Sequence, residues 1–310
     1  MIIDLTRVFS VPAMVTQLSP IFDLKPGNQE LVVINMDTPV IFPEYLTLIV
    51  AAFTWAREHG VKLEVRRILR DKENQYPQRI NFYDLMGIPF RRPLFWKSSK
   101  GKFVEITPLH FDPFNGITIK PKVVDDIIRI FRDNYRVDES IYKSLNYCLW
   151  EQIDNIQNHS GTQGTGFVVA QNYPTKHEIR ICVVDTGRGI YDSLTKTENS
   201  IFSQLTYKEA IRKCIEPKVT RGTGMGNGLY HSSQFIKENK GTFILYSGSY
   251  YITIVNGVVE DVKRGAKWEG TILFQKVNTS NTVNYNAVFN NCPIPGSIEE
   301  CDDWLDGLFE

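Results

Sequence analysis

The sequence predicts an α/β protein in which a small amino-terminal β-α-β domain precedes a larger α/β sandwich. Two observations predict this class. Short apolar runs typical of strands alternate with amphipathic helical segments along the chain. The chain also has 310 residues, which is long enough to bury two separate cores. We therefore expect an amino-terminal domain over residues 1–112, a second domain over 113–277 and a tail over 278–310.

The amino-terminal domain is predicted from alternating strand and helix signals. Pro43 suits the first turn of a helix, and Gly60 suits the position just beyond its end. Val61, Leu63 and Val65 alternate with other residues, as in a strand. The predicted elements are a strand over 30–36, a helix over 43–58, a strand over 61–67, a short helix over 81–86 and a strand over 102–107. Together they predict one small β-α-β-α-β unit.

The second domain is predicted to run helix, helix, strand, strand, polar segment, helix and strands. Thr206 and Glu209 form a capping-box pattern at the start of a short helix within the polar segment 191–221. This order favours a mixed sheet with helices on one face. The predicted helices cover 121–134, 138–158 and 229–239, and the predicted strands cover 166–171, 178–185, 242–247, 250–256 and 268–276.

Composition and charge exclude several classes of protein. The formal net charge is +0, which argues against broad electrostatic binding to nucleic acid or to an anionic membrane. No apolar run reaches the roughly 18–20 residues of a membrane span, and the first residues lack a signal-peptide pattern. The five cysteines include no Cys-x-x-Cys pair. We expect a cytoplasmic protein without disulfides or a zinc site.

The helix predicted over 138–158 carries a regular polar stripe. Glu151, Asn155 and His159 are spaced by four residues, so they share one helical face. An amide oxygen such as that of Asn155 is a hard ligand suited to Mg²⁺, and the Glu151 carboxylate could deprotonate an attacking water. The alternative is a solvated helix face, and His159 also fits a helix end through the dipole alone.

A second candidate is the turn that follows the strand over 178–185. Asp185 comes directly after an apolar run, where its carboxylate could accept a hydrogen bond from a ligand amine. Gly187 and Gly189 leave room for a planar base to approach the backbone. The alternative is an ordinary Asp/Gly turn leaving a strand.

A third candidate is the glycine-rich loop at 222–228, which precedes a helix. Bare N–H groups at a helix start can hold an anion, and Lys218 and Arg221 lie just upstream. A flexible hinge would have the same composition. Two other phosphate motifs fit poorly, because a dinucleotide fingerprint should directly follow a strand and a Walker loop needs Gly-Lys-Ser/Thr.

Taken together, these segments resemble the GHKL ATPase superfamily, which includes gyrase, heat-shock chaperones, histidine kinases and MutL. The resemblance covers about residues 120–277 and implies a Bergerat-type ATP-binding fold, with residues 191–221 as the ATP lid. The matching boxes are Glu151-x-x-x-Asn155, Asp185-x-Gly187-x-Gly189, Gly224-x-Gly226-x-Gly228-Leu229 and Gly270-Thr271.

The resemblance implies ATP and Mg²⁺ as cofactors and assigns roles to matching positions. Asn155 would bind Mg²⁺, Asp185 would accept a hydrogen bond from the adenine amino group, and Thr271 would support the adenine. Gly189 would pass close to the nucleotide, and the loop glycines would meet the phosphates. The implied nucleotide contacts are Asn155, Asp185, Gly187, Gly189, Lys218, Arg221, Gly224, Met225, Gly226, Gly228, Leu229 and Thr271.

Within the superfamily, the Glu151–Asn155–His159 pattern is most similar to the bacterial anti-sigma-factor serine kinases. Asn227 departs from the leucine frequent in histidine kinases, and no helical hairpin with a phosphorylatable histidine precedes the first box. A sensor histidine kinase is therefore not expected. The elements 31–36, 43–58 and 61–65 resemble a STAS-like domain, although no clear phosphorylatable Ser or Thr stands near Asn81.

Three functions remain open from the sequence. The first is an ATP-driven switch in a bacterial-type signalling system, with slow hydrolysis assisted by Glu151. The second is a serine/threonine kinase acting on a STAS-like or signalling protein, and the third is an interaction module that binds nucleotide without turnover. A homodimer is compatible with each. The acidic tail end, with Trp304, Leu305 and Leu308, suits either a short helix docking in a groove or packing on its own domain.

Overall fold

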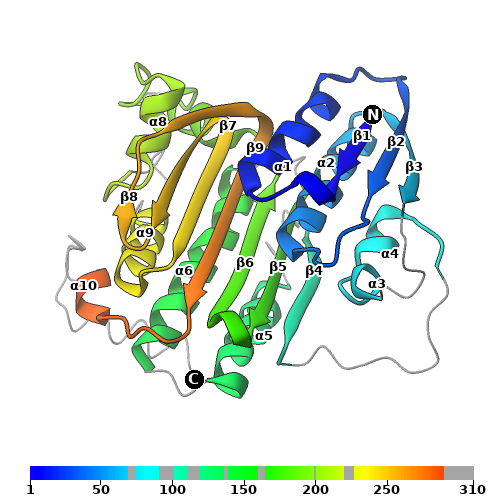
Figure 1. Cartoon of the computed structure of the whole chain (residues 1–310). Helices are drawn as coiled ribbons and strands as arrows, with labels where there is room; N and C mark the ends of the chain where they lie inside the picture. The colour runs from blue at the N-terminus through cyan, green and yellow to red at the C-terminus, as the bar shows by residue number, and fades with distance from the viewer. Residues whose placement is uncertain are drawn as a thin grey trace.

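The computed structural model describes residues 1–68, 75–90, 101–110, 119–135, 139–159, 165–198, 200–219 and 227–289. The predicted tail helix around Trp304 lies outside these ranges, as does the predicted domain boundary at residue 112. Figure 1 shows two β-sheets with helices packed around them.

The smaller sheet has three parallel strands in the order β1-β2-β3. Four predicted elements of this region are confirmed: β2, α2, β3 and α4. The strand β1 and the helix α1 were not predicted. The elements are β1 (Ile2–Asp4), η1 (Leu5–Arg7), α1 (Val11–Leu18), η2 (Ser19–Asp23), β2 (Gln29–Asn35), α2 (Pro43–Glu58), β3 (Lys62–Ile68), α3 (Tyr76–Arg79) and α4 (Phe82–Met86).

The larger sheet has six strands in the order β4-β5-β6-β9-β7-β8. Every pairing in it is antiparallel, so the prediction of a mixed sheet was wrong. The elements are β4 (Phe103–Leu109), α5 (Lys120–Asn134), α6 (Glu139–His159), β5 (Gly166–Tyr173), η3 (Pro174–Lys176), β6 (Glu178–Asp185), α7 (Gly189–Thr195), α8 (Tyr207–Lys213), α9 (Gly228–Asn239), β7 (Thr242–Val255), β8 (Val258–Val259), β9 (Lys263–Asn278) and α10 (Tyr285–Phe289).

Two strand predictions need correction. β4 was expected to complete the amino-terminal unit, but it pairs antiparallel with β5 at the edge of the large sheet. The two strands expected over 242–247 and 250–256 are one strand, β7, whose register against β9 shifts at Gly248. Gly248 has a φ of +61°, which a glycine adopts without strain, so the strand bends there instead of ending.

Both faces of the large sheet are covered, whereas helices were expected on one face only. Side chains alternate along each strand, so Val168 and Ala170 of β5 join the core beneath α5, α6 and α9. Phe167 and Val169 point the other way and join the core formed with α1 and α2. The sheet therefore forms a central layer between two helical layers (Figure 1).

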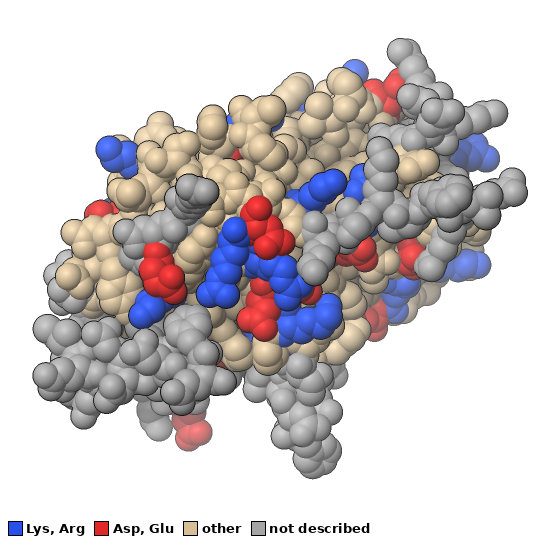
Figure 2. All heavy atoms as spheres, turned by 90° about the horizontal axis from the view of Figure 1, so that it is seen from below, with Lys and Arg blue, Asp and Glu red and all other residues tan. Residues whose placement is uncertain are grey.

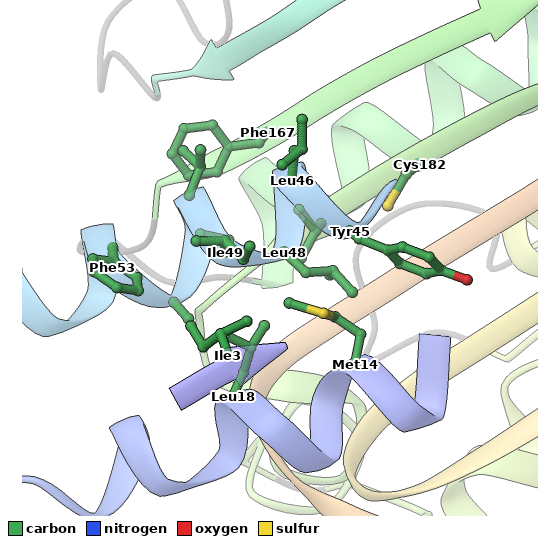
Figure 3. Close-up of a cluster of buried hydrophobic side chains, with 14 of the residues drawn as sticks. Ile3, Met14, Leu18, Tyr45, Leu46, Leu48, Ile49, Phe53, Phe167 and Cys182 are labelled. Atoms are coloured by element: carbon green, nitrogen blue, oxygen red, sulfur yellow. The ribbon is translucent and has the colours of Figure 1, made fainter. Parts of the chain in front are cut away.

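The helix α2 lies between the large sheet and the small one. It begins at Pro43 and is followed by Gly60, whose φ of +70° suits the position after a helix end. Its buried residues surround the helix, as expected of a helix enclosed on all sides. Figure 3 shows side chains of α1 and α2 meeting in one apolar cluster, with Phe167 and Cys182 of the large sheet beside them. This cluster joins the amino-terminal elements to the sheet.

A buried ion pair crosses the same interface. Arg180 of β6 donates to Glu44 in the first turn of α2 at 2.7 Å, and its Nε donates to Glu178 at 2.8 Å. The Phe42 ring lies 3.8 Å from the guanidinium carbon. Burial raises the pKa of Glu44, although Arg180 lowers it. The described ion pairs also include exposed ones, and Figure 2 shows acidic and basic side chains side by side on one face of the molecule.

We predict that Arg180→Met destabilises the fold by about 3–5 kcal/mol, because it leaves the Glu44 carboxyl buried without its cation. The double variant Glu44→Leu/Arg180→Met should recover most of this loss, since it removes both buried charges. Urea unfolding measures both. Lys122→Met is the matched control, because Lys122 pairs with Asp126 on the exposed side of α5, and it should change the unfolding free energy by less than about 1 kcal/mol. If the double variant is no more stable than Arg180→Met, the loss in Arg180→Met does not come from the unpaired Glu44 carboxyl group.

Candidate functional site

Asp185 is the last residue of β6, at one end of the large sheet. Its neighbour across the sheet is Thr271 of β9, and the neighbour of Thr271 on the other side is Ser247 of β7. Strand register therefore brings three polar residues, distant along the chain, into one row. Two of them, Asp185 and Thr271, belong to the predicted nucleotide contacts.

The Asp185 carboxyl group is almost completely buried, with 6% of the residue exposed. The Gly187 N–H donates to its Oδ1 at 2.8 Å, and the indole N–H of Trp268 donates to its backbone carbonyl at 3.1 Å. Burial raises the pKa of Asp185 to about 7, although hydrogen bonds from the backbone of Gly187 and Thr271 lower it. A carboxyl group in this state can change its charge near neutral pH, so a ligand donor would favour its ionised form.

Two glycines make this arrangement sterically feasible. Gly270 has a φ of +91°, and a Cβ there would stand 2.3 Å from the Asp185 carbonyl oxygen and 2.6 Å from its Oδ1. Gly189 has a φ of +74°, and a Cβ there would stand 2.7 Å from Ser247 Oγ. Both positions therefore require glycine for conformation and for space.

Ser247 ties the start of α7 to β9. Its hydroxyl donates to the Gly270 carbonyl at 2.7 Å and accepts from the Ile190 N–H at 2.9 Å. The predicted turn from Asp185 to Gly189 is thus held against β9 by side-chain and backbone hydrogen bonds. The sequence reasoning missed Ser247 and Trp268, because nothing near them in the sequence marks them as neighbours of Asp185.

Glu151 of α6 lies against the start of α9. A Cβ on Gly228 would stand 2.6 Å from Glu151 Oε2, so two predicted site residues are in direct contact. Burial raises the pKa of Glu151, Asp154 raises it further, and Lys120 lowers it. A carboxyl group whose pKa is raised is a stronger base than an ordinary carboxylate once it is ionised.

Lys120, which the sequence reasoning did not select, adds a cation near Glu151. Its ammonium group pairs with Asp154 and lies 4.0 Å from the centre of the Trp150 ring. Burial lowers the pKa of Lys120, and the charges of Asp154 and Glu151 oppose this shift. A buried lysine at a helix start gives no distinct signal in the sequence, because lysine there is normally solvated.

Asn155 is half-buried one turn after Glu151, and its neighbour Ile156 fixes where this part of α6 lies. A Cβ on Gly166 would stand 2.7 Å from Ile156 Cγ2, and Gly166 is the partner of Asp185 across β5 and β6. The carboxyl end of α6 therefore packs over the end of the sheet that carries Asp185. The side chain of His159 lies outside the described residues.

A buried amide network fixes the rotation of α6. The amide of Gln152 donates to Ser232 of α9 at 3.0 Å and accepts from Gln275 of β9 at 2.8 Å. Each bond is buried, and a buried polar group without a partner costs about 1–3 kcal/mol. The face of α6 that carries Glu151 and Asn155 is thereby held relative to α9 and β9.

The two ends of the glycine-rich loop meet. The Lys218 N–H donates to the Asn227 side-chain oxygen at 2.9 Å, and Lys218 has a φ of +60°. Gly228 and Leu229 then begin α9, with Leu229 packed against the main core. The loop residues Arg221, Gly224, Met225 and Gly226 lie outside the described residues.

The structure thus brings predicted site residues together in two separate groups. Asp185, Gly187, Gly189 and Thr271 form one group, and Glu151 and Gly228 form the other, while Lys218 marks the start of the loop between α8 and α9. In the described ranges, no group of three or more His, Cys, Asp or Glu side chains could hold a metal ion. The role of Asn155 toward Mg²⁺ therefore stays a prediction.

The fold and site define an α/β protein whose antiparallel sheet ends in a buried aspartate enclosed by glycines. No protein-family model matches the chain, and no curated protein matches it. Within the part of the chain that the structure describes, no helix combines the length and the apolar character required to cross a bilayer.

We predict that Gly270→Ala costs more stability than Gly27→Ala. Both glycines have similar positive φ values, +91° and +86°, so both variants should lose about 1–2 kcal/mol to backbone strain. Only the alanine at Gly270 meets a neighbour, the Asp185 carbonyl, which should add about 1–3 kcal/mol. Unfolding in urea compares the two variants directly. Equal losses in the free energy of unfolding would show that the close approach of Gly270 to Asp185 does not affect stability.

Proposed function

We propose that the chain is an ATP-binding protein of the GHKL type, with a Bergerat-type fold, that uses Mg-ATP binding and slow hydrolysis as a conformational switch in signalling. The observation that carries this proposal is the surroundings of Asp185. Its carboxyl group is buried at a strand end, next to Thr271 and close to two glycines of positive φ. A buried acceptor at a strand end suits a planar base that carries an amino group.

The adenine would use the Asp185 carboxylate as acceptor for its amino group. Burial of an ionised carboxylate is costly even with the backbone donors of Gly187 and Thr271, and the raised pKa of Asp185 reflects that cost. A hydrogen bond from the amino group would stabilise the charged form. Gly189 would let the base approach the backbone, and Thr271 would support the base from β9.

The phosphates would lie toward α6 and the start of α9. Gly228 and the loop glycines before it would offer backbone N–H groups to the phosphates. Asn155 would hold Mg²⁺ through its amide oxygen, and the ion would neutralise phosphate charge. Glu151 touches Gly228, and in this proposal its carboxylate would accept a proton from a water that attacks the terminal phosphate.

The amino-terminal elements suit the regulatory part of this proposal. We propose a STAS-like unit here, because β2, α2 and β3 form the parallel β-α-β arrangement that motivated the resemblance. Since α2 packs on the sheet face opposite α6, a change at the nucleotide site could reach this unit through the sheet. A signalling protein is the partner class that this arrangement suits.

We predict that Asp185→Asn weakens Mg-ATP binding by about 1–3 kcal/mol, or roughly 5- to 150-fold, in calorimetric titration. With the pKa of Asp185 near 7 in the free protein, the ionised fraction rises about tenfold from pH 6 to pH 8. Between pH 6 and pH 8, the affinity of the wild type for Mg-ATP should therefore rise about tenfold more than the affinity of Asp185→Asn does. The nucleotide's own titration is common to both proteins and cancels in this comparison.

Asp126→Asn is the control for this titration, because Asp126 pairs with Lys122 and Arg129 on the outer side of α5. It should bind Mg-ATP as the wild type does. Equal affinity of wild type and Asp185→Asn at both pH values would reject Asp185 as the adenine contact.

We predict that Glu151→Gln lowers ATP hydrolysis at least about 100-fold while the affinity for Mg-ATP changes less than about threefold. The amide keeps the size of the side chain and removes the proton acceptor. Release of phosphate from labelled ATP measures turnover. Glu139→Gln, an exposed change in the first turn of the same helix, should keep wild-type turnover.

Two other outcomes of the labelled-ATP assay are informative. Unchanged hydrolysis in Glu151→Gln would contradict the role of Glu151. Label transferred to a partner protein, instead of released phosphate, would identify the serine/threonine kinase alternative, and tight binding without either product would identify a nucleotide-regulated interaction module.

A further inference from the structure

A pocket lies beside α7, and Gly189 and Gly270 are among the residues that line it. It has a volume of about 360 Å³, which falls within the range of small-ligand sites. Of the predicted nucleotide contacts that the structure describes, only Gly189 lines it. The larger residues that line it come from α7, α8, β7, β9 and the position just before α7: Arg188, Tyr191, Tyr207, Tyr250, Arg264 and Lys267.

Three tyrosine rings in nearly parallel planes form one wall of this pocket. Tyr191 and Tyr207 stack with centroids 3.7 Å apart and planes 18° apart. The Tyr207 and Tyr250 rings have centroids 6.5 Å apart and planes 20° apart. Gly248 lies beside these rings, since a Cβ there would stand 3.6 Å from the Tyr207 ring, an ordinary van der Waals distance. Tyr207 is 46% exposed, so aromatic surface remains free for a planar ligand.

The charged groups of the pocket leave two cations uncompensated. Lys267 pairs with Glu269, and Asp192 pairs with Lys196 at 2.7 Å. The side chains of Arg188 and Arg264, by contrast, have no ion-pair or hydrogen-bond partner within the described ranges. Guanidinium groups bind carboxylates through paired N–H donors and also lie well against flat rings.

We infer that this pocket is a second ligand site, for a small planar aromatic anion such as an aromatic carboxylate. The ring of the ligand stacks on the tyrosine wall, and its carboxylate meets the guanidinium groups at the mouth. The site is separate from the proposed nucleotide site, because Asp185, Thr271 and Glu151 do not line it. The two sites have neighbouring walls, because Gly189, Ser247, Trp268 and Gly270 line the pocket and also surround Asp185.

The test uses 2-naphthoate as the probe, titrated into the full chain by calorimetry. Two comparison compounds separate the two interactions: cyclohexanecarboxylate carries the charge without a planar ring, and 2-naphthalenemethanol carries the ring without the charge. Each should bind at least about tenfold more weakly than 2-naphthoate. Arg264→Gln and Tyr207→Leu should each weaken 2-naphthoate binding by about tenfold or more.

Arg129→Gln is the matched control, because Arg129 lies on the exposed face of α5. It and Asp185→Asn should both bind 2-naphthoate as the wild type does, and Mg-ATP should not displace the probe. The inference is overturned if 2-naphthoate does not bind, if both pocket variants bind it normally, or if Asp185→Asn or Mg-ATP abolishes binding, which would place the probe in the nucleotide site.

Discussion

The burial of the Asp185 carboxyl group at the end of β6 constrains much of what surrounds it. A carboxylate loses its hydration on burial, and among the described residues the backbone of Gly187 and Thr271 replaces part of that hydration. The chain turns sharply after Asp185, so that the Gly187 N–H donates to the carboxyl group. β9 passes so close to Asp185 that a side chain at Gly270 would clash with it. Ser247 and Trp268 complete this enclosure with hydrogen bonds to Gly270 and Asp185. A buried carboxyl group with few hydrogen-bond donors is typical of ligand-binding sites, where the ligand supplies a further donor.

The second constraint is that the large sheet is buried on both faces. Antiparallel sheets often leave one face to solvent, and their strands then alternate apolar and polar residues. In β6 the run Ile181-Cys182-Val183-Val184 is apolar throughout, because α6 covers one face and α2 the other. Arg180 is the exception on the α2 face, and it is matched by Glu44. The amino-terminal elements thus share a core with the sheet that carries the proposed site.

Local signals in the sequence predicted local structure well. Pro43 and Gly60 mark the ends of α2, and the Thr206–Glu209 capping box is present at the start of α8. Non-local features were not predictable in this way. β4 follows the amino-terminal elements in sequence but pairs with β5, and strand pairing depends on contacts that no short segment encodes. For the same reason the sequence singled out Asp185 and Thr271, but not Ser247 or Gln152, whose roles depend on which strands and helices become neighbours.

The central claim is that α6, the end of β6 and the loop before α9 act on one adenine nucleotide. A crystal structure of the chain grown with Mg²⁺ and a non-hydrolysable ATP analogue tests it most directly. The account predicts the adenine amino group within about 3 Å of an Asp185 carboxylate oxygen, and the phosphates at the start of α9 near Gly228. A nucleotide bound elsewhere, with the Asp185 carboxyl group still enclosed by protein alone, would contradict it.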